Sequence, residues 1–257
     1  MRALLLDVGN TRIKWGVGDE TGIHRTGHIA QATLTEKGLG VLTSRLPHDV
    51  DAVIASNVAG PTFATRLAGV IGAHCGRDVR FAASTRTACG ITNGYRQPRR
   101  LGVDRWVALI GAWAELERAC LVVDAGTAVT IDALDDEGRH LGGQILPGIA
   151  LMASSLAEDT AQIPPTKPVK TELLTGENLF AKNTRTAVQS GALGAVTGAV
   201  ERAIRTLRSS AYDAELVLTG GDASRILGAL DAEPLHRPNL VLQGLWRLLE
   251  TDPPRTP

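Results

Sequence analysis

The sequence predicts an α/β protein whose two similar domains face one another across a cleft. The chain has 257 residues, enough for one large domain or two of about 100 to 150 residues each. The stretches ALLLDVGNTRIKWGVGDETG and CLVVDAGTAVTIDALDDEG follow one plan: strand, Asp-x-Gly turn with Thr, second strand, and an acidic turn that ends in Gly. Such a hairpin followed by β–α units, occurring twice, is typical of paired α/β domains.

The two copies of this hairpin differ in length by one residue. Asp7 and Asp124 occupy equivalent places, and the distance from the first acid to the closing glycine is 15 residues in one copy (Asp7 to Gly22) and 14 in the other (Asp124 to Gly138). One inserted residue, such as Asn10, accounts for the difference.

Further strands and helices follow each hairpin in a similar order. The first half predicts strands over 23–30, 50–57 and 78–83 and a helix over 61–75, with a proline near its first turn. The second half predicts strands over 139–146 and 214–221, helices over 184–208 and 222–230, and a short strand with a helix inside 239–250. We therefore expect an N-terminal domain over 1–115 and a C-terminal domain over 116–257.

The amino-acid composition indicates which kinds of partner and which cellular compartment to expect. Lys plus Arg and Asp plus Glu are both 27, so no strong net field favours nucleic acid or a membrane. Cys75, Cys89 and Cys120 have no CxxC spacing, which favours a reducing cytoplasm. The apolar run at 3–6 is too short for a signal peptide, and the uncharged stretch at 141–157 falls short of a membrane span.

The paired Asp-x-Gly turns suggest phosphate binding. A single such turn is explained by turn chemistry alone, because Asp, Gly and Asn are ordinary turn residues. Two of them at equivalent places in a repeat favour a nucleotide site. Backbone N–H groups and Thr hydroxyls would cradle phosphates there, while the acids would hold a cation.

Six segments spread over nearly the whole chain form a recognisable motif set: DVGNTRIKWG (7–16), NGYRQPRRLGVDRW (93–106), DAGTAVTID (124–132), LGGQILPG (141–148), KNTRTAVQSG (182–191) and LVLTGGDA (216–223). The set resembles that of type III pantothenate kinases, members of the acetate kinase, sugar kinase, Hsp70 and actin superfamily. The two turns indicate the superfamily, and LGVDR after a Tyr indicates the family. Arg99 and Arg100 lie where the resemblance sets no strict requirement.

The resemblance implies duplicated ribonuclease-H-like (actin-like ATPase) domains. It also implies an activity: ATP phosphorylates the primary hydroxyl of pantothenate to give 4'-phosphopantothenate, the first step of coenzyme A biosynthesis. The partners would be ATP with Mg²⁺, pantothenate and a second copy of the chain, without nucleic acid or membrane.

The resemblance assigns the first turn to the phosphates of ATP, through Asp7, Gly9, Asn10, Thr11 and Lys14. Asp7 would hold magnesium, through water, and Lys14 would contact phosphate oxygens. The alternative for Lys14 is a solvated lysine on a strand.

The second turn contributes Asp124, Gly126 and Thr127. The resemblance places a monovalent cation, K⁺ or NH₄⁺, beside Asp124, where it would offset phosphate repulsion. Alternatively, Asp124 caps its own turn. Gly220 and Gly221 would let the backbone approach the adenine or ribose, or they serve as plain turn residues.

Asp104 is the predicted catalytic base. A primary alcohol is a poor nucleophile at neutral pH, so phosphoryl transfer gains from a carboxylate that orients the hydroxyl and accepts its proton late in the reaction. The resemblance places that base in the GxDR motif. The alternative is a helix N-cap, because Asp before an apolar periodic run is a common cap.

By resemblance, Tyr95, Gly102, Val103 and Arg105 join Asp104 in the pantothenate site. The planar fork of an arginine suits the substrate carboxylate, although Arg105 could instead form a structural ion pair. In the family, Thr184 contributes to this site across a homodimer interface. Its alternative is a place at a helix N-terminus.

Two other functions stay open from the sequence. One is another enzyme of the superfamily, a sugar or acetate kinase or a phosphatase of phosphate chains, because the two turns do not specify the acceptor. The other is a regulatory module that holds a nucleotide without turnover. The GVDR segment argues against the first, and the intact Asp104 argues against the second.

Overall fold

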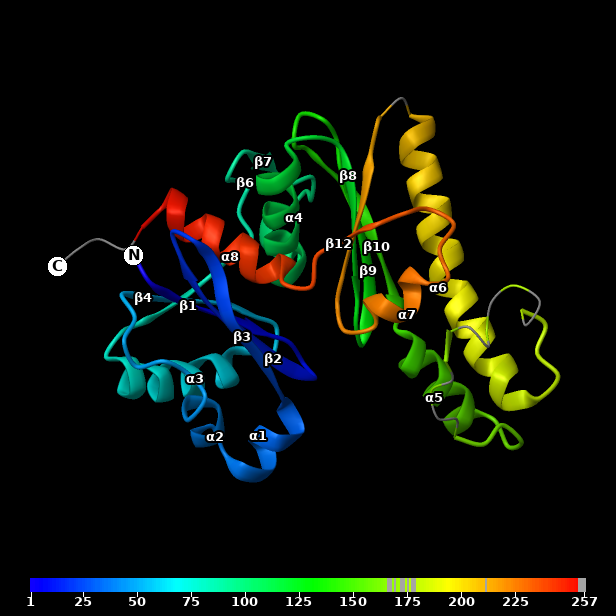
Figure 1. The fold of residues 1–257 in the computed structure, drawn as a ribbon, viewed down its shortest axis with the longest axis horizontal. Helices are drawn as coiled ribbons and strands as arrows, with labels where there is room; N and C mark the ends of the chain where they lie inside the picture. Colours follow the sequence, from blue (N-terminus) through cyan, green and yellow to red (C-terminus); the bar gives the residue numbers. More distant parts are fainter. Residues whose placement is uncertain are drawn as a thin grey trace. The chain divides into compact units, whose positions relative to one another are not determined.

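The computed structural model describes residues 1–165, 168, 170–171, 174, 176, 179–210 and 212–253. The chain divides into two compact units: unit 1 comprises Met1–Leu116 with Asn239–Pro257, and unit 2 comprises Glu117–Pro238. Each unit is built on a five-stranded sheet with helices packed on it, which Figure 1 shows in ribbon form.

The sheet of unit 1 has the order β3-β2-β1-β4-β5. Its strands are β1 (Ala3–Val8), β2 (Arg12–Asp19), β3 (Gly22–Ala30), β4 (Ala52–Asn57) and β5 (Val79–Phe81). Neighbours are antiparallel from β1 to β3, and β4 and β5 run parallel to β1. The helices are α1 (Gln31–Lys37), α2 (Gly40–Thr43), α3 (Pro61–Cys75), α4 (Val103–Leu116) and α8 (Leu240–Thr251).

Both faces of this sheet are buried at its central strands β1 and β4, as the apolar sequence of β1 requires. Leu4 and Leu6 belong to a core with residues of α1, α2 and α3, including Leu67. Leu5 and its cross-strand partner Ile54 point to the opposite face, because side chains alternate along a strand. On that side α4 and α8 contact β4, and α8 also contacts β1 (Figure 1).

The last helix, α8, packs in unit 1 because its backbone comes very close to that of α4. A Cβ atom at Gly244 would fall on the carbonyl oxygen of Val107, and one at Gly111 would fall on that of Leu240. Only glycine allows two helices to approach so closely at both points. The predicted C-terminal domain, 116–257, included this helix, whereas the structure groups it with the N-terminal unit.

The sheet of unit 2 repeats the same order as β10-β9-β8-β11-β12. Its strands are β8 (Cys120–Ala125), β9 (Ala128–Leu134), β10 (His140–Pro147), β11 (Glu215–Thr219) and β12 (Leu235–His236), and its helices are α5 (Ile149–Asp159), α6 (Thr184–Ser209) and α7 (Ala223–Leu227). Val196, Val200 and Ile204 recur at one-turn spacing on α6 and join Leu121 and Val123 of β8 in the core. No helix in the described part of the chain combines the length and apolar character that crossing a membrane needs.

The structure confirms the repeat and its one-residue difference. Val8 pairs with Ile13 across the first turn, which leaves residues 9–12 between the two paired residues. Ala125 pairs with Val129 across the second turn, which leaves residues 126–128 between them. The extra residue of the first copy therefore lies inside the turn.

Two predicted elements differ in extent. The short strand expected inside 239–250 lies earlier, at Leu235–His236, and Leu240–Thr251 is helical throughout. The buried residues Val241, Leu245 and Leu249 recur every four positions, the spacing of a helix face, and not at the alternate positions of a strand. The helix expected over 222–230 ends at Leu227, directly before a glycine.

Candidate active site

The first Asp-x-Gly turn is braced by its own hydrogen bonds and by the start of α1. The N–H of Gly9 donates to the carbonyl oxygen of Arg12 at 3.0 Å. Gln31 donates its backbone N–H to the carbonyl oxygen of Thr11 at 2.8 Å and its side-chain Nε2 to that of Gly9 at 3.0 Å. The exposed residues Asn10 and Thr11 therefore sit on a backbone of fixed shape.

A row of polar residues crosses the sheet beside this turn. The strand register pairs Asp7 of β1 with Lys14 of β2 and with Ser56 of β4, so their side chains share one face. The buried Ser56 donates its hydroxyl to Asp7 Oδ1 at 3.0 Å. Asp7 and Lys14, both half-buried, are thus neighbours at the end of the sheet, where one suits a cation and the other suits a phosphate.

The second turn is closed in a similar way. The N–H of Gly126 donates to the carbonyl oxygen of Ala128 at 3.0 Å, and the N–H of Gly148 donates to that of Thr127 at 2.8 Å. A Cβ atom at Gly148 would fall on the carbonyl oxygen of Gly126, so this contact requires glycine. The Thr127 side chain is exposed at the tip of the turn.

Asp124 faces a threonine on each neighbouring strand. Its cross-strand partners are Thr130 on β9 and Thr219 on β11. Within the described residues, no group of three His, Cys, Asp or Glu side chains comes together to hold a metal ion. A cation at either turn would accordingly depend on one carboxylate, supplemented by hydroxyl, carbonyl or phosphate oxygens.

The glycine pair after β11 packs on the end of β8. Gly220 has a φ of 101°, and a Cβ atom there would fall on the Ala125 peptide. The N–H of Asp222 donates to the carbonyl oxygen of Ala125 at 2.9 Å. Turn packing therefore explains why Gly220 must be glycine, and the exposed Gly221 follows it.

Asp104 lies in the first turn of α4. The helix begins at Val103, and the N–H of Trp106 donates to the carbonyl oxygen of Gly102 at 3.0 Å. The sequence left open that Asp104 is the N-cap of a helix starting near Arg105. The helix instead starts at Val103, so Asp104 is its second residue and not its N-cap. Its Oδ1 accepts from the N–H of Arg105 at 2.8 Å. A Cβ atom at Gly102 would lie 2.7 Å from that oxygen, so glycine leaves room for the carboxylate.

Arg105 and Tyr95 form a pair beside Asp104. Arg105 is only 7% exposed, and its Nη1 donates to the hydroxyl of Tyr95 at 3.0 Å. Its Cζ lies 5.7 Å from the centroid of the Tyr95 ring, within the range of a cation–π contact. Of the residues predicted to bind the substrate, Tyr95, Gly102, Val103, Asp104 and Arg105 thus come together in unit 1.

Thr184 is the first residue of α6, in unit 2, and its side chain is exposed. The preceding Asn183 is the helix N-cap, because its Oδ1 accepts from the N–H of Thr186 at 2.9 Å. Thr184 also lines a groove of about 960 Å³ with apolar residues of α5 that include Leu151 and Leu156.

The chain matches the sequence model of the family described as type III pantothenate kinase over residues 3–206. It belongs to the type III pantothenate kinase family. A relative named type III pantothenate kinase from Methylobacillus flagellatus is 40% identical and aligns over 95% of this chain and 96% of its own length.

Solved structures show the same fold at low sequence identity. A structure described as a Baf family transcriptional activator from Campylobacter jejuni is 20% identical, with a TM-score of 0.61 over 97% of this chain and 98% of that one. A ROK family glucokinase from Streptomyces griseus, in complex with glucose and AMPPNP, is 13% identical, with a TM-score of 0.53 over 98% and 99%. This type III pantothenate kinase family member therefore has the duplicated α/β fold of actin-like ATPases and sugar kinases.

Two residues near Tyr95 were not singled out from the sequence. Asn93 is 1% exposed, and its Oδ1 accepts from the N–H of Tyr95 at 3.0 Å while its Nδ2 donates to the carbonyl oxygen of Pro98 at 3.2 Å. Arg86 donates to the carbonyl oxygens of the same segment. Asn93 stands inside a motif of this pantothenate kinase family, but its hydrogen bonds depend on a loop shape that no local pattern predicts.

Proposed function

We propose that the protein phosphorylates pantothenate, with ATP and Mg²⁺, to 4'-phosphopantothenate in coenzyme A biosynthesis. The observation that carries the proposal is the group of Asp104, Arg105 and Tyr95 at the start of α4, in a chain that belongs to the type III pantothenate kinase family. This group offers a proton acceptor and a guanidinium side by side. An acceptor with both a hydroxyl and a carboxylate, such as pantothenate, needs both.

Asp104 acts as the base in this proposal. It orients the primary hydroxyl of pantothenate and accepts its proton late in phosphoryl transfer. Arg105 binds the substrate carboxylate through its planar fork, while the hydroxyl of Tyr95 fixes the guanidinium from one side. Gly102 and Val103 supply the backbone next to these groups.

The first turn binds nucleotide phosphates through the backbone of Gly9, Asn10 and Thr11, with Lys14 reaching the phosphate oxygens. Asp7 holds Mg²⁺ through water. A single carboxylate fits this ion, which is usually bound by one or two carboxylates together with substrate phosphates and water. Bound Mg²⁺ neutralises charge that develops on the phosphates.

The second turn offers the N–H groups and hydroxyl of Gly126 and Thr127 to phosphate, and Gly220 and Gly221 border the adenine or ribose. Asp124 holds a monovalent cation, K⁺ or NH₄⁺. The donor set fits such an ion, since one carboxylate and two threonine hydroxyls, those of Thr130 and Thr219, share its face of the sheet.

The cation role predicts a dependence on the buffer salt. Activity should be high in potassium or ammonium and low in sodium alone, and Asp124→Asn should lower ATP use and abolish the difference between the salts. Steady-state rates in the three chloride salts at equal ionic strength measure this. Full activity of the wild type in sodium alone would contradict the cation site.

The proposal includes a homodimer in which the partner's Thr184 completes the pantothenate site. Unit 2 exposes several large apolar side chains: Leu151 is 46% and Leu156 is 40% exposed beside the Thr184 groove, and Ile145 on the edge strand β10 is 64% exposed. Burying such surface against a second copy is favourable, and unpaired edge strands invite pairing.

Light scattering tests the dimer. We expect a dimer for the wild type, and a monomer with little activity for a Leu151→Asp Leu156→Asp variant. The control is Leu227→Asp, which places the same charge at another exposed leucine of unit 2 outside the groove. An active monomer at assay concentration would remove Thr184 from the site.

We propose that the reaction takes place in the cytoplasm. The three cysteines, Cys75, Cys89 and Cys120, are all free thiols, a state that a reducing compartment maintains. Fractionation of cells that produce the protein tests this location, and recovery outside the cytoplasmic fraction would contradict it.

The decisive experiment measures ATP consumption by the purified protein with pantothenate, acetate or a sugar as acceptor. We expect ADP release only with pantothenate, in equal amount to phosphopantothenate. Turnover with acetate or a sugar alone would favour another enzyme of the superfamily. Nucleotide binding without turnover on any acceptor would favour a regulatory module.

A further inference from the structure

The Arg86 guanidinium donates its hydrogen bonds to backbone carbonyl groups. Its Nη1 donates to the carbonyl oxygens of Asn93 at 2.9 Å and Tyr95 at 3.1 Å, and its Nη2 donates to that of Arg96 at 3.2 Å. A guanidinium has five N–H donors in a rigid fork and stays charged at all physiological pH values. One side chain thus holds three carbonyl groups of a four-residue segment, 93–96.

The Asn93 side chain fixes the same segment from the inside. The N–H of Asn93 donates to the carbonyl oxygen of Arg86 at 2.8 Å, so the two residues are linked in both directions. Buried Asn93 also accepts from the N–H of Tyr95. Between them, Arg86 and Asn93 hold both the N–H and the carbonyl group of Tyr95, while Arg105 holds its hydroxyl.

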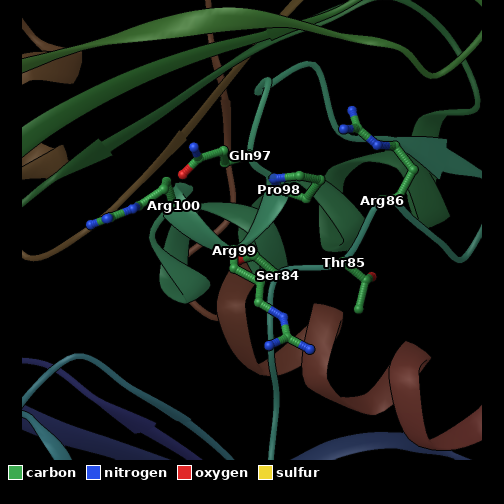
Figure 2. A pocket seen from close by; sticks show the side chains of 7 residues that line it. All are labelled: Ser84, Thr85, Arg86, Gln97, Pro98, Arg99 and Arg100. Carbon is green, nitrogen blue, oxygen red and sulfur yellow. The ribbon is translucent and has the colours of Figure 1, made fainter.

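Arg86 also lines a pocket of about 700 Å³ with Ser84, Thr85 and residues 97–100. Three arginines border this pocket, but Figure 2 shows the guanidinium groups of Arg86, Arg99 and Arg100 pointing to three different sides. They do not converge on a common anion. The defined contacts of Arg86 are those to the 93–96 segment.

We propose that Arg86 is a positioning residue for the acceptor site: it holds the 93–96 segment so that Tyr95 meets Arg105 in the geometry that binds the substrate carboxylate. The inference rests on the proposed pantothenate site at Tyr95 and Arg105. Tyr95 is in a loop, and a loop residue keeps one orientation only where its backbone is held. Lysine could not replace Arg86, because an ammonium is a compact charge without the fork that spans several carbonyl groups.

The first test compares Arg86→Ala with Arg99→Ala, a change to another exposed arginine on the same pocket that has no part in holding the segment. For Arg86→Ala we expect kcat/KM for pantothenate to fall by about tenfold to a hundredfold. The KM for pantothenate should account for most of the loss, and the KM for ATP should stay near its wild-type value. Arg99→Ala should behave as the wild type.

Arg86→Lys keeps the charge and tests the fork. We expect it to recover little of the lost pantothenate affinity while its melting temperature stays near that of the wild type. Equal increases in the KM values for pantothenate and ATP, or full activity of the lysine variant, would overturn the positioning role.

A double-mutant cycle shows whether Arg86 acts through Tyr95. If it does, Arg86→Ala should add little to the loss already caused by Tyr95→Ala, because coupled residues are not additive. Losses that multiply would overturn the inference. If Tyr95→Ala and Arg105→Ala raise the KM for pantothenate while Arg86→Ala does not, only the positioning role fails. If all three leave that KM unchanged, the proposed pantothenate site fails and the positioning role with it.

Discussion

Unit 1 and unit 2 each have an aspartate at the equivalent position of their own sheet, but the neighbours of that aspartate differ. Asp7 is paired across the sheet with Lys14, whereas Asp124 is paired with Thr130. In both units the next parallel strand supplies a hydroxyl beside the acid, from Ser56 or Thr219. One framework therefore places a lysine across from the acid in one copy and a threonine in the other, and the proposed function assigns a phosphate contact to the first and a cation to the second.

The likeness extends to single hydrogen bonds. The residue that follows the third strand braces each turn: Gln31 donates its N–H to the carbonyl oxygen of Thr11 at 2.8 Å, and Gly148 donates to that of Thr127 at 2.8 Å. Gln31 has a side chain that also reaches the turn, while Gly148 has no room for one. The two copies share the backbone of the turn, and they differ in the side chains around it.

The segment that carries the proposed acceptor site has no counterpart in the repeat. Between β5 and α4, unit 1 inserts residues 82–102, which hold the hairpin of β6 (Thr87–Ala88) and β7 (Ile91–Thr92), the Tyr95 loop and a 3-10 turn at Pro98–Arg100. Between β12 and α8 there are only residues 237–239. In the proposed function the duplicated part serves the phosphates, and the added segment together with the start of α4 serves the acceptor. This is why the two turns indicate a superfamily and LGVDR indicates a family.

The largest expected effect comes from a change just after the added segment, in the first turn of α4. Asp104→Asn keeps the shape of the side chain but removes its charge and its capacity to accept a proton. We expect ATP binding to persist, because both turns are untouched, while kcat falls by roughly 10²- to 10⁴-fold, the usual contribution of a positioned acid or base. Nucleotide titration and steady-state kinetics on the same preparation measure the two quantities.

A structural role of Asp104 would give a different result. The side chain lies inside the first helical turn, where loss of an acid weakens the helix only slightly, by about 0.3 to 1 kcal/mol. Asn would then be nearly silent in both rate and melting temperature. A wild-type kcat for Asp104→Asn would contradict the base assignment and direct the search to Asp7 and Asp124.

An intermediate effect is expected when the two turns are compared directly. Lys14→Ala should lower kcat/KM for ATP by roughly 10- to 100-fold, as loss of a charged hydrogen bond to phosphate implies. Thr130→Val, at the corresponding register position of unit 2, should cost less and should act mainly on the potassium response. Equal effects of the two changes on ATP in potassium buffer would show that the turns are used alike, and Lys14 would then be a solvated strand residue.

The sequence predicted the repeat well because its signals are local. Apolar strands that meet Asp-x-Gly turns, and acidic turns that end in Gly22 and Gly138, are short patterns that fix a hairpin wherever it occurs. Apart from β12, the predicted strands of both sheets lie within a few residues of their places in the structure. Helix 61–75 has both predicted bounds, with proline at its start and Gly76 in the left-handed conformation after its end.

What the sequence did not reveal depends on contacts that form only in the folded chain. Nothing near residues 239–257 shows that Gly244 packs on Val107 of α4, so the last helix was placed in the C-terminal domain. Arg86 reaches three carbonyl groups of a loop that only the folded unit brings within range. The resemblance named Tyr95 and Arg105 without showing that they contact each other, which the structure does.

The smallest expected effect comes from comparing the two acidic turns, one in each unit, that contain Asp19 and Asp135. Asp135 is 1% exposed; its Oδ1 accepts from the N–H groups of Glu137 at 3.0 Å and Arg139 at 2.8 Å, and its Oδ2 accepts from Arg139 Nε at 2.8 Å. Asp19, in the equivalent turn of unit 1, has a side chain that is 38% exposed and accepts from Thr21. Asp135→Asn should therefore lower the melting temperature at pH 7 by a few degrees, from a loss of about 1 to 2 kcal/mol, and Asp19→Asn should change it less.

The stabilisation by Asp135 should depend on pH, and the direction of that dependence follows from the pKa of its carboxyl group. Burial raises the pKa of Asp135, but the hydrogen bonds from Arg139 and from the N–H of Glu137 outweigh it and hold the pKa below the ordinary value of 3.8. The unfolded chain binds a proton more readily than the folded one, so the stabilisation is complete above that value and is lost as the pH falls through the lower, folded pKa. The melting temperatures of wild type and Asp135→Asn should differ most, by a few degrees, at about pH 6 to 7. They should converge in acid, where the carboxylate of the wild type is protonated as well. A difference that stays constant down to acid unfolding would show that the carboxylate charge is irrelevant and that only the shape of the turn matters.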